Sequence, residues 1–334
     1  MTPFNTTTER TSSVRVAGAC VRIPIHRIEA KTVISDSVSI NRRQLVLGAA
    51  GTVAAATLMS RSTNAQEQVR EVLPIRDGIW RTREDRHFGL LIETDEGMIV
   101  FDTLNPDFAG WLNAEIKNRF NKPVSWVVYS HNHADHVSGG QAFEEHSPRY
   151  LSHAFARESM ERMGVNTRLP DMTFDNGFDL RLGSRLVELR YHGPNDGRGS
   201  ISLRVPDQRL LSAVDWLVIN RMPYRDLARY DVEGTIRSLY AIDAMDWEIA
   251  SPGHADTGGK AEARIERRYL EALRDGVAEG IASKRNIEEV VRTLRAGLAA
   301  VPEFAALRQF DDWVELNIRG THHQIARIEG FMDG

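Results

Sequence analysis

The chain has 334 residues, enough for one large domain or two small ones, and its 42% hydrophobic and 7% aromatic content is typical of a globular enzyme. Residues 1–65 carry 8 Lys and Arg against 3 Asp and Glu, whereas the remaining residues carry 34 against 43, a net charge of -9. An acidic body without a basic stripe argues against a nucleic-acid substrate, because phosphate binding requires clustered Lys and Arg. The single cysteine, Cys20, lies near the N-terminus, so the rest of the chain can offer neither an internal disulfide nor a cysteine metal ligand.

Residues 1–65 are interpreted as a leader and an export signal. Adjacent Arg42 and Arg43 precede an uncharged stretch, residues 44–60, that is shorter than the roughly 20 apolar residues needed to span a bilayer. Small residues at 62–65 suit cleavage by signal peptidase after Ala65. The segment resembles a twin-arginine export signal, which implies the twin-arginine machinery as a partner, a periplasmic or extracellular destination, and no stable membrane anchor. The 41 residues before the two arginines are either an over-extended start or a disordered leader.

Residues 66–258 are expected to form an α/β core. Short β-type runs separated by turn residues predict strands near 78–80, 87–92 and 97–101, followed by an amphipathic helix over 108–120 and a buried strand over 124–129. A second strand-rich stretch covers 178–219, with strands at 187–191, 200–205 and 209–214. Because this stretch mirrors the first half and both halves end in helices, a layered α/β sandwich is favoured over an open parallel sheet.

Residues 259–334 are expected to form a helical part packed on the core. Apolar residues recur every four positions, as on the buried face of an amphipathic helix, at Ile265, Tyr269, Leu273, Val277 and Ile281. Further helices are predicted at 287–298 and 310–332. These helices could form a dimer contact or cap the sandwich, so the oligomeric state stays open.

The most informative motif is SHNHADHVSGG at residues 130–140, directly after the predicted strand 124–129. It places three imidazoles, those of His131, His133 and His136, and the carboxylate of Asp135 within six residues. Zn²⁺ prefers this mixture of nitrogen and oxygen donors. Further candidate ligands stand at loop positions after later predicted strands, and these are Asp196, Asp215 and His254.

These residues resemble the metallo-β-lactamase superfamily, whose motif HxHxDH is followed by a later histidine, a strand-end aspartate and a final histidine in a Pro-Gly-His turn. Asp215 after LLSAV and His254 after Ser-Pro-Gly match the last two positions. The resemblance implies a four-layer αββα sandwich with extra C-terminal helices. It also implies one or two zinc ions, or other divalent metals, with His131, His133 and a third histidine holding the first ion. Asp135, His136 and His254 would hold the second ion, and Asp215 would bridge the two.

The chain departs from the family at residues 191–200, YHGPNDGRGS, where relatives commonly have a GPxH pattern. The expected histidine aligns with Asp196, whose carboxylate can bind zinc but would make a bound water less acidic. Asp196-Gly197 is also a good turn dipeptide in its own right. Three possibilities stay open: Asp196 is the ligand, His192 swings in instead, or the first site is incomplete.

The resemblance implies a hydrolase acting on a small molecule. A metal-bound hydroxide would attack the carbonyl of an ester, lactone, thioester or amide, and the metal would stabilise the oxyanion. Asp135 would be the catalytic residue that orients the hydroxide and returns its proton to the leaving group. The alternatives are a β-lactamase proper and a non-catalytic metal- or ligand-binding protein with a degenerate first site.

The other histidines lack the spacing of ligands. Four of them are interpreted as surface or satisfied core residues: His87, His146, His322 and His323. His153 is interpreted as structural. Three residues after Asp215 could wall a pocket or pack in the core, namely Trp216, Met222 and Tyr224.

Overall fold

The structure, a computed structural model, describes residues 68–328, which belong to one compact unit, Thr63–Gly334. The predicted leader and signal at residues 1–65 lie outside the described residues. Within residues 68–328, every helix is too short or too polar to cross a bilayer. The predicted core and the predicted C-terminal helices fall in the same unit, and the division at residue 258 stays a prediction.

The first sheet has seven strands in sequence order. The first four pair antiparallel and the last four pair parallel, with β4 belonging to both runs. The strands are β1 (Arg70–Arg76), β2 (Ile79–Glu84), β3 (His87–Thr94), β4 (Gly97–Phe101), β5 (Val124–Val128), β6 (Arg149–His153) and β7 (Met172–Phe174).

The second sheet has five strands in the order β12-β11-β10-β9-β8. Its strands pair antiparallel from β8 to β11, and β12 joins β11 in parallel. The strands are β8 (Gly177–Leu182), β9 (Arg185–Tyr191), β10 (Ile201–Val205), β11 (Leu210–Ala213) and β12 (Ile249–Ala250).

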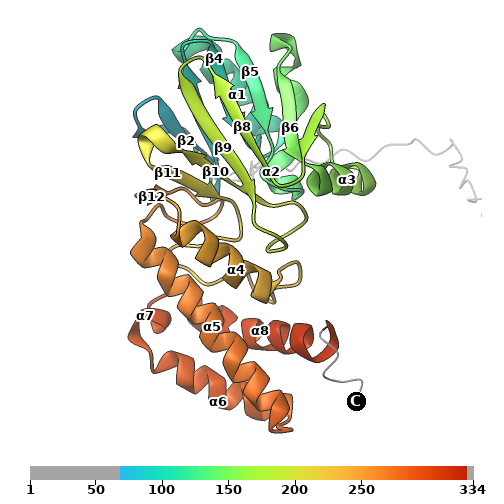
Figure 1. The fold of residues 1–334 in the computed structure, drawn as a ribbon, viewed down its shortest axis with the longest axis vertical. Helices are drawn as coiled ribbons and strands as arrows, with labels where there is room; N and C mark the ends of the chain where they lie inside the picture. The colour runs from blue at the N-terminus through green and yellow to red at the C-terminus, as the bar shows by residue number, and fades with distance from the viewer. Residues whose placement is uncertain (1–67, 329–334) are drawn as a thin grey trace, which may run out of the picture. The chain divides into compact units, whose positions relative to one another are not determined.

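Helices lie against the first sheet, and the helices of the C-terminal part extend beyond the two sheets at one end (Figure 1). The α-helices are α1 (Pro106–Arg119), α2 (Ala134–Val137), α3 (Ala154–Met163), α4 (Val232–Asp243), α5 (Lys260–Ala282), α6 (Ile287–Ala299), α7 (Pro302–Ala305) and α8 (Phe310–His323). Two 3-10 helices, Gly140–His146 and Pro206–Gln208, and a π-helical turn, Gln324–Ile328, complete the described elements.

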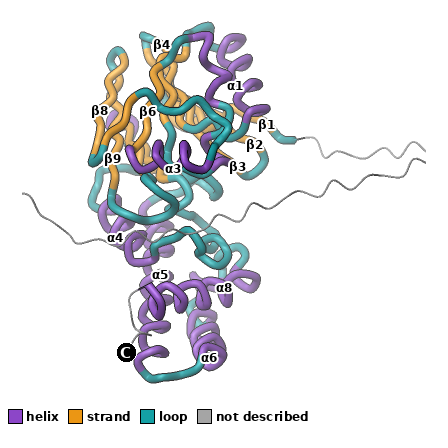
Figure 2. Tube along the Cα trace, turned by 90° about the vertical axis from the view of Figure 1, so that its right-hand side faces the viewer, coloured by secondary structure: helices purple, strands orange, loops and turns teal. Residues whose placement is uncertain are grey.

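Three buried clusters define the layers. One lies between the sheets, where Ile92, Phe101 and Val128 of the first sheet pack with Leu189 and Leu203 of the second. Another fixes α1 and α3 on the outer face of the first sheet (Figure 2). The third joins the outer face of β11 to α4, α5, α6 and α8. The αββα sandwich with extra C-terminal helices is therefore confirmed.

The second outer helical layer is incomplete. It covers β11 and β12, whereas the outer faces of β8–β10 carry charged side chains that pair across the strands. Arg190 pairs with Asp179 at 2.7 Å, and Arg204 pairs with Glu188 at 2.7 Å. Cross-strand pairs of this kind suit a sheet face in contact with water.

Most predicted elements are present with shifted ends. Helix α1 starts at Pro106 because the Asn105 side chain accepts a hydrogen bond from the backbone N–H of Phe108, and proline is well tolerated in the first turn. Helix α8 ends at His323 and the backbone continues as a π-helical turn to Ile328, so the predicted helix over 310–332 is helical as far as the described residues reach.

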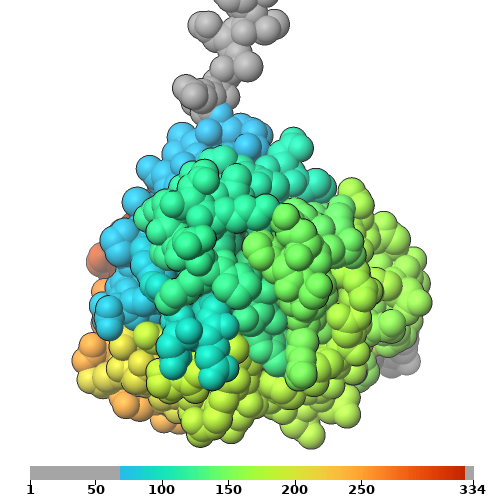
Figure 3. Space-filling model, turned by 90° about the horizontal axis from the view of Figure 1, so that it is seen from above, coloured from blue at the N-terminus to red at the C-terminus, as the bar shows by residue number. Residues whose placement is uncertain are grey.

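The apolar stripe predicted for α5 is confirmed. Tyr269, Leu273 and Val277 are fully buried, and Ile265 and Ile281 pack against the same cluster. Helices α5 to α8 gather at one end of the described unit (Figure 1). From the opposite end, nearly all of the visible surface comes from the residues before α5 (Figure 3).

Candidate metal centre

The predicted ligands gather where strands of both sheets end. His131 and His133 follow β5, and the short helix α2 carries Asp135 and His136. Asp215 follows β11, and His254 lies in the Ser-Pro-Gly-His turn after β12. This turn passes close to His136, since a Cβ on Gly253 would lie only 2.7 Å from His136 Cε1. Glycine at 253 therefore allows the last ligand to reach the others.

The first group of ligands consists of His131, His133 and Asp215. Asp215 Oδ2 lies 3.1 Å from His131 Nε2 and 3.0 Å from His133 Nδ1. All three side chains are buried, with exposures of 0%, 9% and 8%. Two nitrogens and one oxygen converge here in a space closed to bulk water.

The second group consists of His136, Asp215 and His254. His136 Nε2 and His254 Nε2 face each other at 2.9 Å, and they lie 3.2 and 3.3 Å from Asp215 Oδ1. The two carboxylate oxygens of Asp215 thus point to different groups. This is the arrangement expected of a carboxylate that bridges two metal positions.

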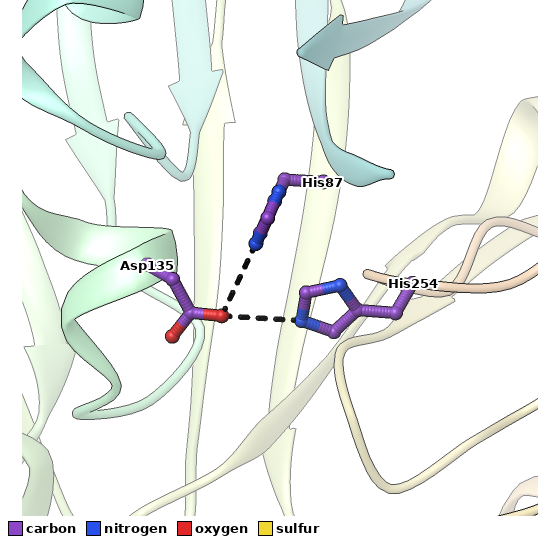
Figure 4. Close-up of side chains that lie close together, drawn as sticks. All are labelled: His87, Asp135 and His254. Atoms are coloured by element: carbon purple, nitrogen blue, oxygen red, sulfur yellow. Dashed lines mark ion pairs between the residues drawn. The ribbon is translucent and has the colours of Figure 1, made fainter. Parts of the chain in front are cut away.

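A third group consists of His87, Asp135 and His254 and lies nearer the surface (Figure 4). Asp135 Oδ2 is 3.3 Å from His254 Nε2 and 3.5 Å from His87 Nε2. His87 is 38% exposed, which agrees with its interpretation as a surface residue, but the β2–β3 hairpin brings it against the motif, which its position in the sequence did not indicate. None of the three groups contains both Asp135 and His136, although these residues are neighbours in the motif.

A buried carboxylate, Asp102, contacts the motif on the side away from the ligand atoms and orients two of its histidines. Its Oδ1 accepts a hydrogen bond from the backbone N–H of Ser130 and its Oδ2 accepts one from the Ser130 hydroxyl, whose oxygen lies 2.7 Å from His131 Nδ1. His136 Nδ1 lies 3.5 Å from Asp102 Oδ2. Ligand histidines are commonly oriented in this way through their second ring nitrogen. Sequence analysis missed Asp102.

The donor set fits divalent metal ions. Asp215 Oδ1 is buried without a hydrogen-bond partner among the described residues, although two imidazole nitrogens lie within 3.3 Å of it. Burial alone would raise the pKa of Asp215, but the charges of His136 and His254 hold it well below its usual range. Burial likewise opposes protonation of His136, yet Asp215 and Asp102 raise its pKa well above the ordinary value. The centre holds concentrated charge in a buried place, as a metal site requires.

Asp196 lies near the first group without joining any of the three. The Asn132 side chain holds its loop, because Asn132 Oδ1 accepts a hydrogen bond of 2.7 Å from the backbone N–H of Arg198. Burial and the charge of Asp215 raise the pKa of Asp196 to about 7. A cation would relieve the repulsion between the carboxylates of Asp196 and Asp215. The role of Asp196 as a metal ligand stays a prediction.

His192 is engaged away from the ligand groups. Its Nε2 lies 2.8 Å from the Ser202 hydroxyl, and its ring packs edge-on against Trp216 with centroids 5.7 Å apart. Burial, assisted by the charge of Arg190, lowers the pKa of His192 to about 4. The structure therefore places His192 as a neutral packing residue and brings it into none of the groups.

The other side chains considered from the sequence lie either in the core or at the surface. Trp216 and Met222 are fully buried and belong to the core, whereas Tyr224 is exposed and packs edge-on against Trp313. The structural interpretation of His153 is confirmed, because it caps α3 and lies 2.6 Å from the backbone carbonyl of Asp175.

The comparison with protein families gives one match, to the metallo-beta-lactamase superfamily, over residues 83–254. This range covers about half of the chain. It begins in β2 and ends on His254, so it includes every predicted ligand.

Two curated proteins illustrate the relationship. The 2,4-dinitroanisole O-demethylase subunit alpha of Nocardioides sp. (strain JS1661) is 28% identical over 203 residues, which is 60% of this chain and 60% of that protein. The metallo-beta-lactamase type 2 of Bacillus cereus is 26% identical over 125 residues, 37% of this chain and 48% of that protein. The chain thus spans between about half and 60% of the length of these relatives.

Solved structures share the fold. A metallo-beta-lactamase from Pontibacter korlensis superposes with a TM-score of 0.56 at 18% identity, covering 61% of this chain and 99% of that one. The structure of TMB-1 superposes with a TM-score of 0.54 at 17% identity, covering 60% and 97%. Because the family match spans the whole ligand set and the solved structures share the sandwich that carries it, this chain belongs to the metallo-β-lactamase superfamily, a family of metal-dependent hydrolases.

Proposed function

We propose that this protein is a zinc-dependent hydrolase that cleaves an ester, lactone, thioester or amide bond in a small molecule and holds two ions. The observation that carries the proposal is the division of the Asp215 carboxylate, with Oδ2 among the nitrogens of His131 and His133 and Oδ1 beside those of His136 and His254. A single ion would not need both oxygens to face separate pairs of imidazoles.

The chain's own residues would hold the ions as these groups indicate. His131, His133 and Asp215 form one position, with Asp196 as the nearby candidate for a further ligand. His254 lies beside Asp215 and His136 in one group and beside Asp135 in another, and these four residues would hold the second ion. Zinc supplies a Lewis acid and lowers the pKa of water close to neutrality.

Asp135 is the residue we assign to proton transfer. Its side chain is 49% exposed, in contrast to the closed first group, so its Oδ2 can meet both water and substrate. Burial of part of the side chain would raise the pKa of Asp135, yet the neighbouring imidazoles of His254 and His87 keep it well below the usual range. Asp135 is therefore ionised and can orient water by accepting a hydrogen bond, and its low pKa means that a proton it takes up is readily released to the leaving group.

Two relatives suggest further candidate classes of substrate. The name of the Nocardioides protein denotes removal of the methyl group from 2,4-dinitroanisole, an activated aryl ether, and its match covers more of this chain than that of the Bacillus lactamase. Activated aryl methyl ethers are thus a second candidate substrate class beside carbonyl compounds. A β-lactam is a third.

The test is metal content and turnover of the full-length protein. Elemental analysis is expected to give about two zinc ions per chain, and a panel of nitrophenyl esters, lactones, thioesters, a chromogenic β-lactam and 2,4-dinitroanisole is expected to show turnover that chelation abolishes and zinc restores. Asp135→Asn should lower kcat by roughly 100-fold or more, as removal of a general base does. The matched control, Asp226→Asn at an exposed position, should leave kcat unchanged. Tight zinc binding without turnover on any substrate would instead support a non-catalytic binding protein.

We also propose that residues 1–65 direct export through the twin-arginine route. The support is the Arg42-Arg43 pair before the uncharged stretch of residues 44–60 and the small residues ahead of Gln66. Expression in a host with this pathway should yield a periplasmic protein that begins near Gln66. Replacing both arginines by lysine should leave the uncleaved chain in the cytoplasm, and cleavage that persists in this variant would argue against the route.

A further inference from the structure

The backbone on both sides of His87 is held in place by contacts of its two chain neighbours. The backbone N–H of Phe88 donates a 2.9 Å hydrogen bond to the carbonyl of Gly253, and His254 Nδ1 lies 3.1 Å from the carbonyl of Arg86. The β2–β3 hairpin is thereby fixed to the turn that carries His254, on both sides of His87. The side chain of His87 projects from this fixed backbone toward Asp135 (Figure 4).

The same contact orients His254. Its Nδ1 can donate to the Arg86 carbonyl, which leaves the lone pair of Nε2 free to bind a metal. Nε2 faces Asp135 Oδ2 at 3.3 Å and His136 Nε2 at 2.9 Å. His254 therefore stands between an inner pair of ligands, His136 and Asp215, and an outer pair, His87 and Asp135.

The outer pair and His254 make a complete set of donors. The ring edge of His87 meets that of His254 with centroids 4.7 Å apart, and the ligand atoms of His87, Asp135 and His254 all lie within 4.8 Å of one another. Two imidazoles and one carboxylate are the protein ligands found at many catalytic zinc sites, where the fourth position stays open to water or substrate. The exposures of His87 and Asp135, 38% and 49%, place that open position toward solvent.

A simpler role for His87 would be a hydrogen bond to Asp135. The distance of 3.5 Å from His87 Nε2 to Asp135 Oδ2 is longer than the 2.7–3.2 Å usual for such a bond. An ion between the two atoms requires about this separation, because zinc lies roughly 2 Å from each of its nitrogen and oxygen ligands.

We propose that His87 is a metal ligand, which together with Asp135 and His254 forms a solvent-facing position for a divalent transition-metal ion. The inference rests on the proposed function, since it concerns the same centre. His254 belongs to both sets, so it would hold an ion together with either the inner ligands, His136 and Asp215, or the outer ligands, His87 and Asp135. The substrate would meet the ion in the outer position.

The test is metal binding by the full-length protein after chelation. Zn²⁺ is titrated into wild type, His87→Ala, His87→Gln and His323→Ala, the last being an exposed histidine on α8 that controls for loss of any imidazole. The affinity for the second ion is expected to fall at least about tenfold in His87→Ala and to stay unchanged in His323→Ala. X-ray absorption of the zinc-loaded protein should report fewer imidazoles per ion in His87→Ala than in wild type.

Three results would overturn the inference. Equal affinities and imidazole counts in wild type and His87→Ala would show that His87 does not bind metal. Full affinity in His87→Gln would assign His87 a hydrogen-bonding role that an amide can replace. If wild type binds no second ion, the two-ion function proposed above fails as well, whereas two ions bound with equal affinity by wild type and His87→Ala contradict this inference alone. Thermal melting of the metal-free variants confirms that each is folded.

Discussion

Arg221 Nη1 donates a 3.0 Å hydrogen bond to the backbone carbonyl of His254. The same guanidinium donates from Nε to the carbonyl of Met222 and lies over the Trp313 ring of α8, 5.5 Å from its centroid. On the other side of the turn, Arg81 donates to the carbonyl of Pro252 at 3.0 Å. Two arginines thus fix the turn that presents the ligand shared by the inner and outer groups.

Replacing Arg221 by methionine is expected to weaken both the fold and the metal centre. The carbonyl of His254 would lose its partner in a part-buried place, which costs about 1–3 kcal/mol of unfolding free energy. His254 would then be less well positioned. The affinity for the second zinc ion should therefore fall, whereas the affinity for the first ion, held by His131, His133 and Asp215, should be kept. Urea unfolding and zinc titration measure the two effects. Arg225→Met, at an exposed position whose side chain takes no part in these contacts, should change neither.

Asp215→Asn tests the bridge. An amide can present only one good metal-binding oxygen, so the two positions can no longer share the side chain. We expect zinc content to fall from about two ions to one or fewer per chain and turnover to fall by at least about 100-fold. Elemental analysis and initial rates provide the measurements, with Asp226→Asn as the control. A variant that keeps two tightly bound ions would show that Asp215 does not bridge.

Four of the candidate ligands could be predicted from the sequence because they lie close together in it. His131, His133, Asp135 and His136 lie on one loop after one buried strand, and a short motif fixes their mutual spacing. Asp102 could have been found by the same logic. It follows β4 directly, β4 runs parallel to β5, and the carboxyl ends of parallel strands meet at one edge of a sheet.

His87 could not be found in this way. Its place in the site depends on the pairing of the β2–β3 hairpin with the turn at residues 251–254, which are distant in sequence and in different sheets. No spacing rule connects such residues. The incomplete second helical layer could not be predicted for a similar reason. Charged residues at alternate positions of β9 and β10 indicate a solvent-exposed face only once the partner strands are known.

Asp196 decides whether the first position is complete. If Asp196 binds metal, Asp196→Ala should lower zinc content toward one ion per chain, whereas Asp196→His, which restores the family's histidine, should keep two. In the metal-free protein the ionised carboxylate is unfavourable, since burial and Asp215 raise its pKa to about 7. Asp196→Asn should therefore raise the melting temperature of the metal-free protein at pH 8, and this gain should vanish when zinc is bound. Unchanged zinc content in Asp196→Ala would make Asp196 a turn residue and leave the first position with three protein ligands.

His192 is expected to make stability depend on pH. Its pKa of about 4 in the folded protein lies below the value of about 6.5 in an unfolded chain, so the unfolded state binds more protons between these limits. The contribution of neutral His192 is complete above pH 6.5 and is lost as the pH falls toward 4. Between pH 8 and pH 5 the loss should be about 2 kcal/mol. His192→Gln, which keeps a donor for the Ser202 hydroxyl, should remove this part of the pH dependence. Urea unfolding of both metal-free proteins at pH 8 and pH 5 measures it, and an equal loss in both would mean that His192 is already free to take up a proton in the folded state.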